Sequence, residues 1–255
     1  MLARYKVRRN YYKVQKTDMA FMIIVTFILG IIFASLTLPK APSEQISTFE
    51  GKTVEVGIPA IGTSGSGVTG RLFATVRQGN GQVLVSVNDV LAQYDTQLSA
   101  RTAAHAASKY SNIDVSNIDI IYTIKVNASA IEGPSAGASM AIATVLAFEN
   151  VTASPKIMAT GSISEDGKIL PVGAIYEKAK AAKDVGVTLF LVPKGQSVSI
   201  KRDRVKSCSY MGTLRYCTID YKDTSVNIGE QLGIAVKEVN TLDDAVQYYK
   251  NQSYA

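Results

Sequence analysis

Residues 132–148 read Glu132-Gly-Pro-Ser-Ala-Gly-Ala-Ser-Met-Ala-Ile-Ala-Thr-Val-Leu-Ala-Phe148. A glycine and a proline precede Ser135, and the small and apolar residues after it predict a tightly packed helix from Ser135 onward. Backbone NH groups at the start of a helix are unpaired and carry partial positive charge, so they suit the oxyanion that forms when a hydroxyl attacks a carbonyl. The alternative is purely structural, because serine is also a favoured N-cap residue.

A serine nucleophile needs a base, and the chain holds one histidine, His105, which we expect inside a helix among alanines. Lysine is therefore the leading alternative, provided that burial lowers its pKa toward neutrality. In a helix predicted from 174 to 185, Lys178 projects from the centre of the apolar stripe at ~100° per residue. The competing interpretation is a lysine at the edge of the stripe whose ammonium returns to water.

The remaining pattern predicts a mixture of strands and helices, which indicates the α+β class. Strands are expected at 53–58, 71–77, 82–87, 118–126, 157–164, 168–171, 188–192 and 234–239, and further helices at 89–110 and 243–249. Asp166-Gly167 is a strong hairpin signal. The glycine-rich residues 62–70 lack the Gly-Lys-Ser/Thr ending of a phosphate loop and are expected to form a turn.

The charge of the chain is concentrated at its N-terminus. Residues 1–18 contribute +5 of the formal net charge of +6, so the remainder is nearly neutral. A domain that binds nucleic acid needs a basic face of its own, and we expect no nucleic-acid partner. With 255 residues and 47% hydrophobic composition, one domain at 51–255 with an appended segment is the expected organisation.

Residues 19–39 carry no charge, and 21 residues are long enough to cross a bilayer as one helix. A cleaved signal peptide is the alternative, but the apolar run exceeds the ~15 residues usual for one. Because the basic tail 1–18 precedes the span, we expect a single-pass protein of the cell membrane with a cytoplasmic N-terminus. A linker, 40–50, then leads to an extracytoplasmic domain.

The two cysteines, Cys208 and Cys217, lie in short β-like runs on either side of Met211-Gly212. This arrangement predicts a cross-strand disulfide, with two free thiols as the alternative. Two cysteines and one histidine cannot make a structural zinc site, so neither a metal nor another cofactor is expected. We expect the surrounding basic segment, 194–222, to be a solvated loop.

Several separated motifs together resemble the proteolytic domain of Lon peptidases. They are Gly133-Pro-Ser-Ala-Gly137, Ala159-Thr-Gly161 before the Asp166-Gly167 turn, Leu170 to Ala182, and Phe190-Leu-Val-Pro193. The separation of 43 residues between Ser135 and Lys178 is also similar to the serine–lysine spacing of that family. The resemblance covers most of residues 65–250 and is firmest in its middle third.

The resemblance implies a Lon-like α+β proteolytic domain in which Ser135 is the nucleophile and Lys178 its general base. It further implies that Thr160 orients the lysine, that Glu132 contacts or gates the dyad, and that backbone amides at Ser135 and Ala136 form the oxyanion hole. Family members commonly assemble into six-membered rings. Ser162 departs from the family, which usually has an acidic residue there.

The expected function is therefore a membrane-anchored endopeptidase that cleaves unfolded or flexible polypeptides through an acyl-enzyme. No Gly-x4-Gly-Lys-Ser/Thr sequence occurs in the chain, so we expect it to work without ATP of its own. Two alternatives stay open. One is a catalytically inactive module for peptide binding or assembly, and the other is an amidase or esterase acting on small molecules with the same dyad.

Overall fold

The computed structural model describes residues 19, 21–33, 51–62, 65–86, 91–127, 130–131 and 133–252. The chain divides into two compact units, Met1–Ser47 and Thr48–Ala255. In the first unit, residues 21–33 are helical and their side chains are exposed. Across the described residues, no helix has both the length and the apolar character needed to span a membrane. The basic tail, residues 34–39 of the predicted span and the 40–50 linker lie outside the described residues.

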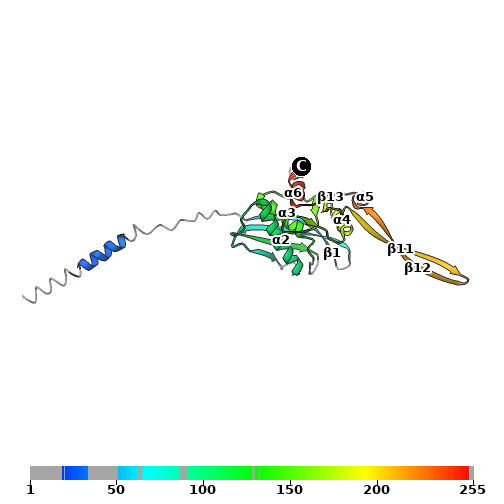
Figure 1. Ribbon diagram of the computed structural model, residues 1–255, viewed down its shortest axis with the longest axis horizontal. Coiled ribbons are helices and arrows are strands. Elements are labelled where there is room, and N and C mark those ends of the chain that lie inside the picture. Colours follow the sequence, from blue (N-terminus) through cyan, green and yellow to red (C-terminus); the bar gives the residue numbers. More distant parts are fainter. Residues whose placement is uncertain are drawn as a thin grey trace, which may run out of the picture. The chain divides into compact units, whose positions relative to one another are not determined.

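The second unit is built on a seven-stranded mixed sheet with the strand order β13-β10-β7-β1-β2-β5-β3. Strands β1 and β13 of this sheet are labelled in Figure 1. The strands are β1 (Lys52–Ile61), β2 (Gly67–Gln78), β3 (Val83–Ser86), β5 (Ile118–Val126), β7 (Ile157–Ala159), β10 (Leu189–Pro193) and β13 (Ala235–Val239). The pairs β1–β2 and β2–β5 are antiparallel, whereas β7 runs parallel to both β1 and β10. Of the turn predicted at 62–70, residues 67–70 belong to β2, and the described residues before them include a hydrogen bond from the Gly62 NH to the Ser66 carbonyl at 2.8 Å.

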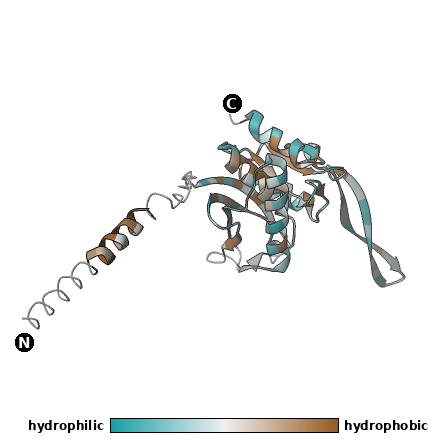
Figure 2. Cartoon of the chain, turned by 60° about the vertical axis from the view of Figure 1, so that its left-hand side comes forward, coloured by the Kyte–Doolittle hydropathy of each residue, from teal (hydrophilic) through white to brown (hydrophobic). Residues whose placement is uncertain are grey.

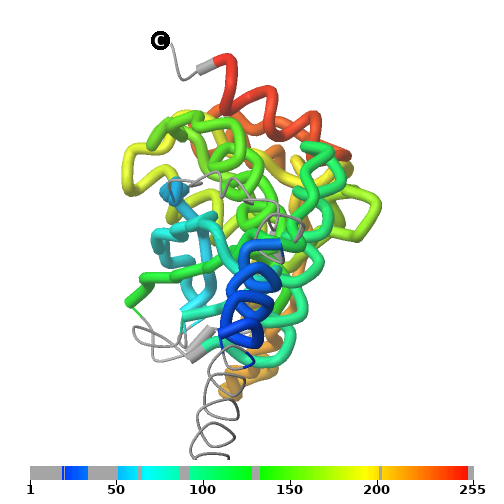
Figure 3. Tube along the Cα trace, turned by 90° about the vertical axis from the view of Figure 1, so that its left-hand side faces the viewer, coloured from blue at the N-terminus to red at the C-terminus, as the bar shows by residue number. Residues whose placement is uncertain are grey.

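Helices cover both faces of this sheet. One face packs against α2 (Tyr94–Ser111), α3 (Gly137–Glu149) and α6 (Leu242–Gln252), and the other against α4 (Ile175–Asp184) and α5 (Ile228–Leu232). Successive side chains of a strand point to opposite faces of the sheet. In β7, Ile157 and Ala159 accordingly pack in the apolar core with α2, α3 and α6, and Met158 packs in the core with α4 and α5. Helix α6 lies beside α2 and α3 (Figure 3).

Small side chains let α2 and α3 pack closely. Every residue of α3 from Gly137 to Ala147 is buried, and α2 meets it with five buried alanines, Ala100, Ala103, Ala104, Ala106 and Ala107. Alanine has the highest helix propensity and occupies little volume, so two alanine-rich helices can approach without cavities. The helix predicted after Ser135 is therefore confirmed, although it begins at Gly137.

Most of the predicted elements are present, with three differences near the candidate site. Helix α2 begins at Tyr94 and not near 89, because Leu91–Ala92 form β4 and pair with β6 (Ala130–Ile131). The strand predicted at 157–164 is split into β7 and β8 (Ser162–Ile163) at Thr160 and Gly161. The short helix α5 was not predicted.

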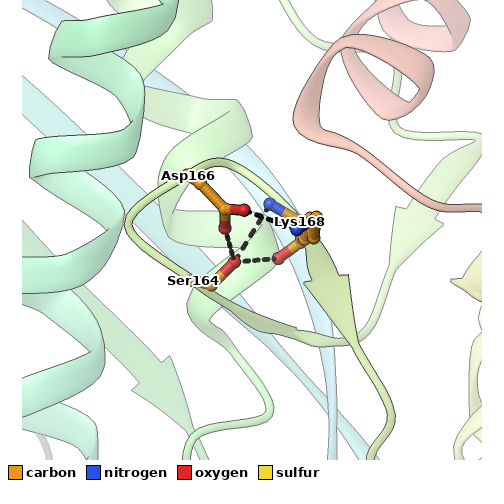
Figure 4. A network of polar contacts seen from close by, with 3 residues as sticks. All are labelled: Ser164, Asp166 and Lys168. Atoms are coloured by element: carbon orange, nitrogen blue, oxygen red, sulfur yellow. Dashed lines mark hydrogen bonds and ion pairs between the residues drawn. The ribbon is translucent and has the colours of Figure 1, made fainter.

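The predicted Asp166-Gly167 hairpin is confirmed between β8 and β9 (Ile169–Leu170). Figure 4 shows its polar network, in which the Ser164 hydroxyl donates to Asp166 Oδ1 at 2.5 Å and Lys168 Nζ lies 2.7 Å from Asp166 Oδ2. Hydrogen bonds from Lys168 and Ser164 lower the pKa of the Asp166 carboxyl to about 2. The turn is thus fixed by side chains of its own, directly after the strand break at Gly161.

The prediction of a solvated basic loop at 194–222 is wrong. Instead, β11 (Val198–Met211) and β12 (Leu214–Asn227) form a separate antiparallel two-stranded sheet, which we call the arm. Figures 1 and 2 show the arm standing out from the rest of this unit. Cys208 and Cys217 are directly opposite each other in its register and form a disulfide, with their Cα atoms 4.0 Å apart.

Candidate active site

Ser135 lies in a turn between β6 and α3. Gly133 has φ +82°, a left-handed conformation that favours glycine, and Pro134 follows it. Helix α3 has Ala136 as its N-cap and no side-chain capping hydrogen bond. Ser135 is therefore not the residue that caps the helix, and capping does not explain a serine at this position.

The backbone of this turn is fixed to the end of β7. The Ser135 carbonyl accepts hydrogen bonds from the Gly161 NH at 3.1 Å and from the Thr160 hydroxyl at 3.5 Å. In return, the Gly161 carbonyl accepts from the Ala138 NH at 3.0 Å. The strand break at Thr160 and Gly161 thus supplies the groups that hold Ser135 in place.

A second constraint comes from Gly137, the first residue of α3. A Cβ atom there would lie 2.6 Å from the Ser99 hydroxyl of α2 and 3.0 Å from the Ile163 side chain of β8. The same Ser99 hydroxyl donates to the Pro134 carbonyl at 3.2 Å. Helix α2 and strand β8 therefore converge on the start of α3 with no room for a larger residue, and the position of Ser135 is correspondingly well defined.

The backbone NH groups beside Ser135 are available to a ligand. No hydrogen bond between described residues takes up the NH of Ser135 or Ala136. The Gly137 NH, by contrast, is used by the Pro134 carbonyl at 3.0 Å. Donors of this kind at the start of a helix can stabilise a negatively charged oxygen.

Lys178 is buried in α4, with only 4% of its surface exposed. Burial lowers the pKa of its ammonium from 10.5 to about 8. Within the described part of the chain, no hydrogen bond or ion pair compensates this burial. Lys180 and Lys183 of the same helix are exposed, so the snorkelling alternative is wrong for Lys178. A buried amine whose pKa is close to neutrality is suited to general-base catalysis.

Two local features place α4. Ala174 precedes the helix at φ +56°, which is unfavourable for a residue with a side chain, and its carbonyl accepts the Lys178 NH at 3.1 Å. At the start of β2, a Cβ on Gly67 would collide with the Glu177 carbonyl and lie 3.0 Å from the Ala181 side chain. The turn of α4 that carries Lys178 therefore packs directly on the backbone of β2.

Ser135 lies in the turn before α3 and Lys178 lies in α4, and these two helices cover opposite faces of the sheet. Between them lies the end of β7, where Thr160 is 1% exposed and its hydroxyl contacts the Ser135 carbonyl. Continued alternation along β7 would put the Thr160 side chain on the face of Met158 and α4. Its predicted contact with Lys178 stays a prediction, and Glu132 lies outside the described residues.

The sequence indicated no role in this region for Ser99, Gly161 or Ala174, although Gly161 and Ala174 stand in two of the motifs that resemble the Lon family. Gly161 carried a further signal, because it follows a short apolar, strand-like run. Ser99 looks like an ordinary helical serine, and nothing in the sequence marks Ala174 as left-handed. Among the described residues there is no group of three or more His, Cys, Asp or Glu side chains able to hold a metal ion.

Most of the chain is similar to a known protease family. Residues 50–239 match the Lon protease (S16) C-terminal proteolytic domain. The chain belongs to this family. Lon proteases act on polypeptides and are serine peptidases with a Ser–Lys dyad, and the mixed arrangement of strands and helices described above is the Lon proteolytic-domain fold. The predicted family and enzyme class are thus confirmed.

Individual relatives agree with the family. The chain is 32% identical to the Lon protease of Dictyoglomus thermophilum over 170 residues, which are 62% of this chain and 21% of the relative. It is 34% identical to the Lon protease of Roseiflexus castenholzii over 133 residues, 50% of this chain and 16% of the relative. Against the archaeal Lon protease of Archaeoglobus fulgidus, identity is 35% over 86 residues, 34% and 14% of the two chains. The matched regions thus span about a fifth or less of these relatives.

Proposed function

We propose that this Lon-type domain is an endopeptidase in which Ser135 is the nucleophile and Lys178 the general base. The observation that carries the proposal is the burial of Lys178, which lowers the pKa of its amine to about 8. At pH 7 about a tenth of such an amine is neutral, roughly 300-fold more than at the ordinary lysine pKa. Only the neutral form can accept a proton from a serine hydroxyl.

The proposed reaction proceeds through an acyl-enzyme. Neutral Lys178 takes the hydroxyl proton while Ser135 Oγ attacks the peptide carbonyl carbon, and the free NH groups of Ser135 and Ala136 stabilise the resulting oxyanion. The Lys178 ammonium then gives its proton to the leaving amine, and the peptide C–N bond breaks. In the second half, Lys178 takes a proton from a water molecule as the water oxygen attacks the acyl carbon. The ester bond between this carbon and Ser135 Oγ then breaks, and the Lys178 ammonium returns the proton to Oγ.

In this mechanism the two side chains meet around the end of β7, because the strand stops at Ala159. Thr160 is proposed to contact both residues. Its hydroxyl donates to the Ser135 carbonyl, and its side chain, on the sheet face that α4 covers, orients Lys178. Glu132 is proposed to contact or gate the dyad. Unfolded or flexible polypeptides are the proposed substrates, since an extended segment most easily reaches a serine in a turn.

We also propose that residues 19–39 anchor the chain in the cell membrane, with residues 1–18 in the cytoplasm and the Lon domain outside. The uncharged apolar composition of 19–39 and the basic residues before it support this topology. A six-membered ring and cleavage without ATP are further parts of the proposal. Resistance of the chain to alkaline extraction from membranes, and protection of an N-terminal tag from external protease in intact cells, test the anchor and its orientation.

The dyad is tested by labelling Ser135 with a fluorophosphonate probe across a range of pH. We expect the labelling rate to rise with a midpoint near pH 8, and to be lost in Ser135→Ala and Lys178→Met. Lys180→Met is the matched control, because Lys180 is exposed on the same helix. A midpoint above ~10, the ordinary lysine value, would refute Lys178 as the base.

Two further outcomes separate the alternatives. Absence of labelling at every pH would favour an inactive peptide-binding or assembly module. Labelling without any cleavage of casein, combined with hydrolysis of small esters or amides, would favour a small-molecule hydrolase. An ATP-independent peptidase should cleave casein equally well with and without ATP. This cleavage should be lost in both Ser135→Ala and Lys178→Met.

A further inference from the structure

The arm has two chemically different faces. In its antiparallel register, directly opposite residues lie on the same face, and neighbours along each strand alternate. One face of its outer half, the cationic face, consists of Arg204, Lys206, Cys208, Tyr210, Arg215, Cys217, Ile219 and Tyr221. The other, the hydroxyl face, consists of Val205, Ser207, Ser209, Tyr216, Thr218 and Asp220, and it ends at the turn with Met211 and Leu214. The cationic face thus carries three positive charges and no acid.

Large apolar groups on the arm are open to solvent. At the turn, Met211 and Leu214 are 71% and 72% exposed, and Tyr210 beside them is 70% exposed. On the cationic face, Ile219 and Tyr221 are also exposed. Exposed apolar groups that cluster at one end of a structure usually mark an interaction surface.

The combination of charge and apolar groups identifies the chemistry of the partner. Tyrosine is enriched at the boundary between lipid and water, where its ring is buried and its hydroxyl is hydrated. Lysine and arginine next to apolar side chains are attracted by anionic headgroups. Tyr210 and Arg215 illustrate the pairing, since they are directly opposite in register and the guanidinium lies 6.0 Å from the ring centre.

A second copy of the chain is a less suitable partner. The acidic hollow of the domain, at Glu238, Asp243 and Asp244, would be the natural counterpart for a basic arm. These carboxylates are already used within the domain. Glu238 accepts from the Ser197 NH and hydroxyl, and Asp244 accepts from the NH groups of Asn240 and Thr241. Nor would charge pairing there account for the exposed Met211 and Leu214.

We propose that the outer half of the arm binds the surface of an anionic lipid bilayer. Tyr210, Ile219 and Tyr221 of the cationic face, and Met211 and Leu214 at the end of the arm, enter the headgroup boundary, while Arg204, Lys206 and Arg215 face the lipid charges. This contact is separate from the apolar span at 19–39. It does not depend on the Ser135–Lys178 dyad. A membrane contact at the arm would restrict how the catalytic domain is oriented above its membrane.

The test places an environment-sensitive fluorophore on the turn of the full-length chain. Thr213→Cys, labelled without reductant so that the Cys208–Cys217 disulfide is kept, is reconstituted into vesicles containing lipids with a quencher on the acyl chain. With about one third anionic lipid we expect a blue shift and quenching. Purely zwitterionic vesicles or high salt should abolish both signals, although the 19–39 segment is present in every sample.

Variants on the two faces of the arm show whether the cationic face is responsible for binding to anionic lipid. Lys206→Gln and Arg215→Gln should each lower the docking equilibrium constant about fivefold. Lys222→Gln is the matched control, because it removes the same charge from the opposite side of the arm and should leave the constant within about twofold. Leu214→Asp should abolish quenching by the acyl-chain lipid.

Three outcomes would overturn the proposal. The first is no quenching in anionic vesicles, and the second is equal quenching in zwitterionic and anionic vesicles. The third is a blue shift that grows with the number of chains per vesicle without quenching by lipid, which would identify a second copy as the partner. Fluorophosphonate labelling of each variant reports separately on the dyad, so failure of one proposal is distinguishable from failure of the other.

Discussion

Replacing Lys178 by methionine is expected to stabilise the fold while it removes the proposed base. The buried ammonium has a pKa of about 8 in the folded chain against 10.5 when exposed. This difference corresponds to about 3 kcal/mol by which folding disfavours the charged amine. Methionine has a similar length and no charge, so Lys178→Met should recover up to about 3 kcal/mol at pH 7 with little loss of packing.

The stability that Lys178→Met gains over the wild type should depend on pH. Below pH 8 the amine is charged in both the folded and the unfolded chain, so the wild-type domain bears the whole penalty. Between pH 8 and 10.5 the unfolded chain binds more protons than the folded chain, and wild-type stability therefore rises with pH. Above 10.5 the amine is neutral in both states, and the advantage of the variant should disappear.

The measurement is urea unfolding of the full-length wild type and variant at several pH values, read as the difference between the two free energies of unfolding. At pH 7 the gain corresponds to an increase in Tm of roughly 6–12 °C for a domain of this size. Lys180→Met is the control and should change little, because Lys180 is exposed and paired with Asp184 at 3.1 Å. A less stable variant at pH 7, or a gain that does not vary with pH, would refute the buried-amine argument.

Three further changes test the surroundings of the proposed dyad. Gly137→Ala should lower the free energy of unfolding by about 1–3 kcal/mol and slow labelling of Ser135, because the start of α3 has no room for a Cβ. Gly173→Ala is the control and should change little, because a Cβ there meets nothing within 4 Å. Urea midpoints and the labelling rate are measured for both variants. Thr160→Val should slow fluorophosphonate labelling of Ser135, and Thr160→Ser should restore the rate. A shift in the pH midpoint of labelling in the valine variant would reveal a contact between Thr160 and Lys178. Tyr249→Phe removes a buried hydroxyl that has no partner among the described residues and should raise stability by about 1 kcal/mol, read from its urea midpoint; a loss would show that the hydroxyl is hydrogen-bonded.

Local patterns in the sequence were sufficient for much of the sheet and for the two candidate residues. The strand predicted at 118–126 agrees with β5 at both ends, and the predicted helix around Lys178 agrees with α4 within one residue. Both elements have one buried face, so the apolar period is visible in the sequence. The burial of Lys178 followed from its position in that period, which is why the candidate base could be selected before its surroundings were known.

The arm could not be predicted as two long strands for the same physical reason. A two-stranded sheet with both faces exposed buries no side of its strands, so basic, hydroxyl and apolar residues can occupy either face and the sequence resembles a loop. The signal that did exist was symmetry. Cys208 and Cys217 are equally distant from the Gly212-Thr213 turn, which fits a hairpin register, but this symmetry does not reveal that pairing continues to Val198 and Asn227.

The break at Thr160 and Gly161 is the part of the site that sequence reasoning placed incorrectly, and it is also the part that the proposed mechanism needs. An unbroken strand from 157 to 164 would separate α3 from α4 by a continuous row of backbone, because these helices cover opposite faces of the sheet. Because β7 ends at Ala159, the Thr160 hydroxyl and the Gly161 NH can bind the Ser135 carbonyl. The local preference of these residues for a strand is thus overridden at the point where the proposed mechanism brings Ser135 and Lys178 together.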